Sequence, residues 1–364
     1  EEEVTVAKTE ITHHKSATLK LHSEKHVQGK AMLLVHQQNT EEYNEFAANR
    51  FLPALDEPLS TFSIDVDNAA YSNVRRFINQ GTFPPIDAIR TEEFLNYFTY
   101  DYPTPQGKDP VCITTEVSNA PWNMQHKLVH IGIKAKGIPT DNLPASNLVF
   151  LIDVSGSMSD ANKLSLLKSS LKLLVKQLRP QDRVAIVTYA NHTKEVLAST
   201  PGSDKAKILD AIDGLYASGG TAGGDGIQRA YRVAENNFIK GGNNRIILAT
   251  DGDFNIGISS PEELEKMIET KRNTGIYLTV LGFGMGNYKN NRMQILAEKG
   301  NGNHVYIDNL TEAKKVLVNE FGGTLFTVAK DVKIQVEFNP AKVQAYRLIG
   351  YESRLLEAKD FNDD

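Results

Sequence analysis

The chain has 364 residues, 40% of them hydrophobic and 23% charged, as expected for a globular protein of two domains or of one domain with an appendage. Its formal net charge of −5 is mild and negative, which argues against nucleic acid as a partner. No apolar run approaches the ~20 residues that span a bilayer, and the single cysteine, Cys112, excludes an internal disulfide framework.

Residues 1–45 differ in composition from the rest of the chain. They are rich in Lys, Glu, Thr and His, with one short apolar run at 31–35. The chain begins at Glu1 rather than Met and shows no signal peptide, which fits the removal of an export signal or anchor. We predict a flexible linker here. Metal binding is the alternative, but the spacing of the four histidines matches no metal-ligand template: His13, His14, His22 and His26.

Residues 46–140 are predicted to form an accessory segment of short helices and strands. "SNVRRFINQG", 72–81, places Val74, Phe77 and Ile78 on one helix face, ahead of a glycine suited to a C-terminal cap. "IDAIRTEEFLNYF", 86–98, predicts a second helix from the spacing of Ile86, Ile89, Phe94, Leu95 and Phe98. Alternating apolar residues then predict strands at 111–118 and 127–135.

Residues 145–323 are predicted to form an α/β domain with a doubly wound, mostly parallel, Rossmann-like sheet. Apolar runs of strand length occur at 148–152, 184–189, 246–250, 276–282 and 304–307, with helical patterns between them. Such alternation, with strands apolar throughout, indicates a parallel sheet covered on both faces. "TKEVLAST", 193–200, follows the second strand too closely for a helix to intervene and is predicted to be an antiparallel edge strand.

Three of the helical patterns in this domain are clear. Segment 162–178 carries one leucine stripe, 260–269 opens with Ser260 as a cap and Pro261 in the first turn, and 311–321 closes the series with Ala313, Val316, Leu317 and Phe321. The stripe consists of Leu164, Leu167, Leu171, Leu174 and Leu178.

Residues 326–364 return to alternating apolar positions. Val332, Ile334, Val336 and Phe338 predict the first arm of a hairpin that breaks near Pro340. We expect these strands to join those at 111–135 in a small β-rich accessory domain. The α/β domain would then be inserted between the two halves of that unit.

Acidic residues end two strands that the fold brings together. In a doubly wound sheet of order 3-2-1-4-5-6, the first and fourth strands are neighbours, and ligands bind at their carboxyl ends. The first strand ends in Asp153 and the fourth is followed by Asp251. Two adjacent carboxylates repel each other, and a divalent cation removes that repulsion.

Hydroxyl groups complete a set of oxygen ligands. Ser155 and Ser157 follow Asp153, and Thr221 lies in the glycine-rich "ASGGTAGGDG". An all-oxygen set suits Mg²⁺, with Mn²⁺ or Ca²⁺ as alternatives, better than Zn²⁺ or Cu²⁺. Taken alone, the Asp-x-Ser-x-Ser segment also fits a helix cap formed by Ser157 or Asp160.

"DVSGS", "GGT" and "ATDGD" together resemble the metal-ion-dependent adhesion site of von Willebrand factor type A domains. Segment 49–103 resembles the region that precedes this domain in secreted or envelope-anchored bacterial proteins. The resemblance implies a non-enzymatic adhesion module outside the cytoplasm, whose ion recruits a carboxylate of a protein partner. It also implies a role for Asp160 at a neighbouring ion in some relatives. By this resemblance the metal ligands are Asp153, Ser155, Ser157, Thr221 and Asp251.

The rival hypothesis is a Mg²⁺-dependent phosphotransferase similar to the haloacid dehalogenases, with Asp153 as nucleophile. Against it, Ser155 stands where a general acid is expected, and the candidate phosphate ligand Lys240 has no supporting context. "GFGMG", 282–286, lacks the full dinucleotide fingerprint and is predicted to be a turn. His192 is either a rim contact for a ligand or an exposed loop residue, and Trp122 is predicted to pack in the accessory unit or at an interface.

Overall fold

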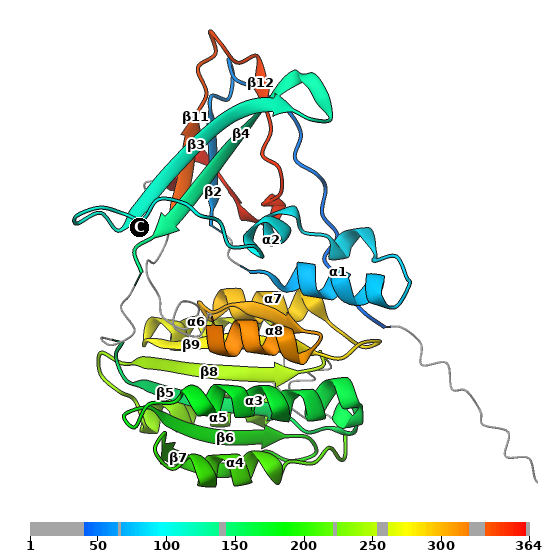
Figure 1. The fold of residues 1–364 in the computed structure, drawn as a ribbon, viewed down its shortest axis with the longest axis vertical. Helices are drawn as coiled ribbons and strands as arrows, with labels where there is room; N and C mark the ends of the chain where they lie inside the picture. Colours follow the sequence, from blue (N-terminus) through cyan, green and yellow to red (C-terminus); the bar gives the residue numbers. More distant parts are fainter. Residues whose placement is uncertain are drawn as a thin grey trace, which may run out of the picture. The chain divides into compact units, whose positions relative to one another are not determined.

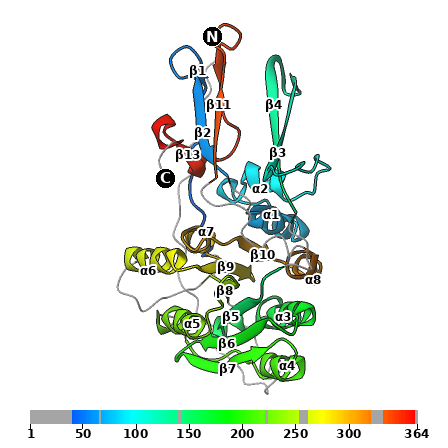
Figure 2. The same cartoon turned by 90° about the vertical axis from the view of Figure 1, so that its left-hand side faces the viewer.

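The computed structural model describes residues 40–64, 67–137, 143–220, 224–252, 261–319 and 332–361. Its largest sheet has six strands in the order β10-β9-β8-β5-β6-β7 (Figure 1, with β10 labelled in Figure 2). Adjacent strands run parallel except β6 and β7, which confirms the predicted antiparallel edge strand. With β5 counted as first, this is the predicted order. The strands are β5 Ser146–Asp153, β6 Arg183–Tyr189, β7 Lys194–Pro201, β8 Asn243–Thr250, β9 Ile276–Phe283 and β10 His304–Ile307.

Helices cover both faces of this sheet (Figure 2). One face packs against α3 Leu166–Gln177, α4 Lys205–Asp213 and α8 Leu310–Lys314. The other packs against α5 Gly224–Asn236, α6 Pro261–Asn273 and α7 Asn290–Lys299. Alternate residues of β5 enter the two apolar clusters, since Phe150 belongs to one and Leu151 to the other. Burial on both faces explains why the strand is apolar throughout, and the predicted doubly wound α/β fold is confirmed.

The leucine stripe anchors α3 to the sheet, because all five of its leucines are at most 6% exposed. The regular α-helix begins only at Leu166, after a 3₁₀ turn at Gly156–Ser159 and a π-helical turn at Ala161–Ser165. A second π-helical turn, Lys315–Asn319, follows α8. The side chain of Asn309 caps α8 by accepting a hydrogen bond from the Glu312 amide at 3.0 Å. The predicted cap Ser260 and Phe321, the last apolar residue of the helical pattern predicted at 311–321, lie outside the described residues.

The accessory strands pair differently from the prediction. β2 Leu59–Ser63 lies between β11 Lys333–Glu337 and β13 Leu355–Leu356, antiparallel to both. β1 Leu52–Pro53 pairs with β12 Ala345–Tyr346, and β3 Val111–Ala120 pairs with β4 Asn123–Ala135. The hairpin predicted to break near Pro340, and the pairing of its strands with those at 111–135, are therefore wrong. Local alternation cannot reveal that the partner of β11 is a short, hydroxyl-rich segment, in which Thr61 contacts Gln335 from 274 residues earlier. The six-stranded domain is nevertheless inserted between β2 and β11.

Two helices precede the six-stranded domain, α1 Ala69–Asn79 and α2 Thr91–Asn96. Gly81 follows α1 at φ +70°, as a C-terminal cap requires. Val74 and Phe77 are buried as predicted, but Ile78 is 64% exposed. The single long helix predicted over 86–98 is also wrong. A 3₁₀ turn at Ile86–Ala88 and two extended residues precede α2, so the helical period is interrupted and Ile86, Leu95 and Phe98 are exposed.

Helix α1 packs on the six-stranded domain at β10. Ala69 is fully buried in the same apolar cluster as Tyr306, and Ser72 donates a hydrogen bond to the Tyr306 carbonyl at 2.7 Å. Arg75 forms ion pairs with Asp308 at 2.5 Å and with Glu312 at 2.8 Å. The accessory segment and the domain therefore share buried surface.

Residues 40–43, here called the strap, bind the loop between β9 and α7. The amides of Thr40 and Glu42 donate to the carbonyls of Gly286 and Tyr288 at 2.7 and 3.0 Å. The buried carboxylate of Glu41 accepts hydrogen bonds from Arg76 at 2.7 and 2.9 Å and from the Gly286 amide at 2.7 Å. The strap belongs to the folded unit rather than to the linker predicted over 1–45, whose residues 1–39 lie outside the described part.

Candidate functional site

The two acids meet at one edge of the sheet. β5 ends at Asp153 and β8 at Thr250, immediately before Asp251. The strands are parallel neighbours in register, with Ile152 opposite Ala249, so both ends reach the same edge. Asp153 and Asp251 are 0% exposed, and burial of two like charges side by side is costly unless something compensates it.

Asp153 is held by hydrogen bonds on both carboxylate oxygens. The Ser155 amide donates to Oδ1 at 2.9 Å, and the Thr250 hydroxyl donates to Oδ2 at 3.1 Å. Burial nevertheless raises the pKa of Asp153 to about 6, and the charge of Asp251 adds to that rise. Sequence analysis missed Thr250, although it lies within the "ATDGD" segment.

The two serine hydroxyls converge. The Oγ atoms of Ser155 and Ser157 lie 2.9 Å apart, and Ser155 is 1% exposed. Ser155 directly precedes the 3₁₀ turn, which returns the next hydroxyl toward it. Neither Ser155 nor Asp160 makes a side-chain capping bond where it precedes a helical turn in this segment. The helix-cap alternative, which named Ser157 or Asp160, therefore finds no support at Asp160.

The glycine-rich loop is described up to Gly220, and this part is hydrogen-bonded to the segment that carries the serine turn. The Gly156 amide donates to the Gly219 carbonyl at 2.9 Å, and the Ser218 amide donates to the Val154 carbonyl at 2.8 Å. Gly219 has φ +80°, and a Cβ there would lie 2.5 Å from Nδ2 of Asn191, so a side chain at this position would clash. Thr221, the predicted third hydroxyl, lies outside the described residues.

Asn191 is a supporting residue that sequence analysis overlooked in favour of His192. Its Oδ1 accepts a hydrogen bond from the Gly220 amide at 2.7 Å, so it holds the chain that leads to Thr221. His192 is exposed. Its position just after the second strand, at the carboxyl edge of the sheet where ligands bind, could have indicated this role.

A lysine that the sequence analysis did not single out contacts the acid pair. The Lys163 ammonium lies 2.9 Å from Oδ2 of Asp251 and 3.0 Å from Oδ1 of Asn287, and the residue is 4% exposed. Lys168, Lys172 and Lys176 recur every four residues along the helix, and Lys163 is out of phase with them. That phase difference was the signal for a lysine turned away from solvent.

The other residues considered from sequence lie elsewhere or remain exposed. Asp160, the candidate for a second ion, has a side chain 56% exposed and lies 3.7 Å from the Lys163 ammonium. Lys240 is exposed in the turn before β8 and so sits at the opposite, amino-terminal edge of the sheet. Trp122 is 60% exposed, so the predicted packing role is wrong and an interface role stays a prediction.

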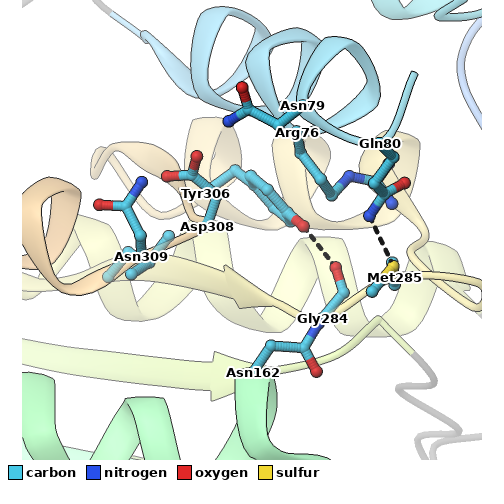
Figure 3. Close-up of a pocket in the computed structure, with 10 residues that line it drawn as sticks. Arg76, Asn79, Gln80, Asn162, Gly284, Met285, Tyr306, Asp308 and Asn309 are labelled. Atoms are coloured by element: carbon cyan, nitrogen blue, oxygen red, sulfur yellow. Dashed lines mark hydrogen bonds between the residues drawn. The ribbon is translucent and has the colours of Figure 1, made fainter. Parts of the chain in front are cut away.

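A pocket of about 250 Å³ opens beyond the carboxyl ends of β9 and β10, at the same edge of the sheet (Figure 3). Asn79 and Gln80 of α1 line it together with Asn162, Met285 and Asn309. Its wall includes Gly284, whose carbonyl accepts a hydrogen bond from the Tyr306 hydroxyl. Four of its lining side chains are amides, which both donate and accept hydrogen bonds, and Arg76 and Asp308 add one charge of each sign.

The donor set fits a hard divalent cation. Two buried acids, one with a raised pKa, and a converging pair of hydroxyls offer the oxygen ligands that such a cation binds. Within the described ranges no three His, Cys, Asp or Glu side chains are grouped to hold a metal. Any cation here would therefore depend on the hydroxyls for its remaining protein ligands.

Comparison with known families agrees with the fold. The family model of the von Willebrand factor type A domain matches residues 147–319, and a model described as von Willebrand factor matches residues 37–130. A third, described as the C-terminal part of uncharacterized protein YfbK, matches residues 323–364. Among solved structures, BatB from Bacteroides thetaiotaomicron aligns with a TM-score of 0.42 at 21% identity, over 50% of this chain and 98% of that one.

Two relatives illustrate how far the similarity extends. Mouse inter-alpha-trypsin inhibitor heavy chain 4 is 28% identical over 179 residues, 46% of this chain and 19% of that protein. YfbK of Escherichia coli K12 is 51% identical over 332 residues, 89% of this chain and 58% of that protein. This chain thus spans a little over half the length of that relative. Domain and relative together identify the chain as a member of the von Willebrand factor type A family, whose domains are typically modules of protein interaction and adhesion.

Proposed function

We propose that the protein binds Mg²⁺ at the carboxyl edge of its sheet and uses the ion to recruit an acidic side chain of a protein partner. The observation that carries this proposal is the meeting of two fully buried carboxylates with a pair of hydroxyls 2.9 Å apart. Ser155 and Ser157, with Thr221, would hold the ion directly, while Asp153 and Asp251 would supply its balancing charge. Mn²⁺ or Ca²⁺ would suit the same oxygens.

Hydroxyl ligands matter for recognition because they carry no formal charge. Both oxygens of Asp153 already accept protein hydrogen bonds, which favours contact with an ion through water. An ion held mainly by neutral oxygens keeps its attraction for an external carboxylate. Since Mg²⁺ prefers octahedral coordination and keeps some water, a water position is available for exchange with a partner's carboxylate.

The polar pocket, with four amides, Arg76 and Asp308 in its lining, supports a partner that is a protein. It lies at the same sheet edge as the acids, and amide groups bind peptide backbone and polar side chains through paired hydrogen bonds. We propose that a partner occupies the ion and this pocket together. An extracytoplasmic location stays a prediction from the family resemblance. Among the described residues, none of the helices has the length and apolar character needed to cross a membrane.

One observation favours the alternative function, phosphotransfer with Asp153 as nucleophile, and another argues against it. Lys163 provides a cation beside the acids, as a phosphate ligand would. A nucleophile must reach the phosphorus in line, however, and Asp153 is 0% exposed with both oxygens engaged. Lys240, the lysine first considered for phosphate, is at the opposite edge of the sheet.

Isothermal titration with Mg²⁺ tests the proposal. The wild type should bind one ion, and Ser155→Ala with Ser157→Ala should weaken binding by at least about tenfold, the cost typical of disturbing a metal site. Ser169→Ala, an exposed hydroxyl on α3 that bonds the Ser165 carbonyl, is the matched control and should bind like the wild type. Equal binding by the double variant would refute the site, and turnover of a phosphate ester would favour the alternative.

A further inference from the structure

We propose that Lys163 keeps the metal site short of anionic charge, so that the ion is held firmly only when a partner's carboxylate joins it. This inference rests on the proposed function, because it concerns the same cation. It assigns to Lys163 a positioning and charge-balancing role. Metal binding and ligand binding would then strengthen each other.

The geometry places an ammonium group against one of the two acids. The Lys163 ammonium is 2.9 Å from Asp251 Oδ2 and buried with it. The Asp160 carboxylate lies 3.7 Å from the same ammonium, but its side chain is 56% exposed, so it contributes little compensating charge. Without a metal ion, Lys163 thus offsets about half of the charge that Asp153 and Asp251 bring to the edge of the sheet.

The lysine is held in this place from several sides. Asn287 accepts a hydrogen bond from the ammonium at 3.0 Å. Gly284, at φ +80°, has no side chain, and a Cβ there would lie 2.3 Å from Cε of Lys163. The Gly286 amide is in turn bound by Glu41 of the strap. The stem of Lys163 thus occupies a channel that the β9–α7 loop leaves open for it.

A count of formal charges gives the consequence. Asp153 and Asp251 with Lys163 sum to one negative charge, so a divalent ion leaves the site with one positive charge. A partner's carboxylate then brings the total to zero. With a neutral residue at position 163, the ion alone would neutralise the acids, and the carboxylate would add an uncompensated negative charge.

Mn²⁺ titration followed by electron paramagnetic resonance measures this coupling. The free ion is quantified in sodium chloride and in sodium acetate of equal ionic strength, with acetate as the carboxylate probe. The proteins are the wild type, Lys163→Met, Lys163→Gln and the control Lys172→Met, whose lysine pairs with Asp213 in a partly exposed position. Lys163→Gln retains a hydrogen-bond donor without charge and covers the case in which Lys163→Met does not fold.

In chloride, both Lys163 variants should bind Mn²⁺ at least about tenfold more tightly than the wild type, because a nearby positive charge is removed. Acetate should tighten binding to the wild type and to Lys172→Met, and should fail to do so in the Lys163 variants. If the wild type binds but the variants match it in both salts, the inference is wrong and the metal site stands. If none of the four proteins binds Mn²⁺, the proposed function fails and the inference with it.

Discussion

At the scale of single residues, Asp153 is the most strongly perturbed carboxylate of the site. Burial is the main cause of its raised pKa of about 6, and the hydrogen bonds from Ser155 and Thr250 only partly offset it. The folded state therefore binds a proton more tightly than the unfolded chain, whose Asp pKa is about 3.9. Stability from this group is complete below pH ~4 and is lost as the pH rises through ~6.

Asp153→Asn should remove that pH dependence in the absence of metal. In EDTA, the variant's free energy of unfolding relative to the wild type should rise between pH 4 and 8 by up to about 3 kcal/mol, since one pKa unit is 1.36 kcal/mol. With saturating Mg²⁺, the wild type should instead be the more stable of the two proteins, because only the wild type binds the ion. Urea unfolding across this range is the measurement, with Asp210→Asn, an exposed acid on α4, as control. A difference independent of pH would contradict the assigned pKa.

Sequence was informative about those residues whose role follows from strand ends. Asp153 and Asp251 could be predicted because parallel strands end at one edge, and Ser155 because it follows directly. The phase of Lys163 could have indicated that it turns away from solvent, but its partner could not be predicted, since its orientation depends on a π-helical turn and on a glycine in another loop. Neither feature has a local sequence signature that predicts a contact 88 residues away.

At the scale of elements, the strap is the part least expected from sequence. Its composition continues that of the linker, and the side chain of Glu41 adds ionic and hydrogen-bond contacts to the backbone hydrogen bonds of Thr40 and Glu42. Burial alone would raise the pKa of Glu41, but the hydrogen bonds and charge of Arg76 outweigh burial and hold that pKa below its usual value. The strap thereby links α1 to the β9–α7 loop that supports Lys163.

Two adjacent acids of the strap should differ sharply in how much they contribute to the free energy of unfolding. Glu41→Gln leaves the Arg76 guanidinium buried without its ionic partner and should cost about 3 kcal/mol or more. Glu42→Gln removes a pair with Lys289 in which the acid is 47% exposed, and should cost less than about 1 kcal/mol. Urea unfolding of both variants measures the difference. Similar small losses would mean that the strap detaches before the rest of the protein unfolds.

At the scale of the whole molecule, the insertion of the six-stranded domain into a β-rich unit explains which predictions succeeded. The order of the six strands follows from strand–helix alternation, because each element packs on its neighbours in the sequence. The pairing of β2 with β11 joins residues on either side of the inserted domain, and no local period encodes it. The site follows the same division, because its oxygen ligands and Thr250 lie within local motifs, whereas tertiary packing brings Lys163 and Asn191 to them.

The most direct test of the central claim is anomalous diffraction from crystals of the wild type grown with Mn²⁺. The account predicts a single strong peak bonded to the hydroxyl oxygens of Ser155 and Ser157 and close to that of Thr221, with Asp153 and Asp251 adjacent. Coordination distances should be a little over 2 Å, as for hard cations bound by oxygen. A crystal with Mn²⁺ bound elsewhere, or with these oxygens free of metal, would contradict it.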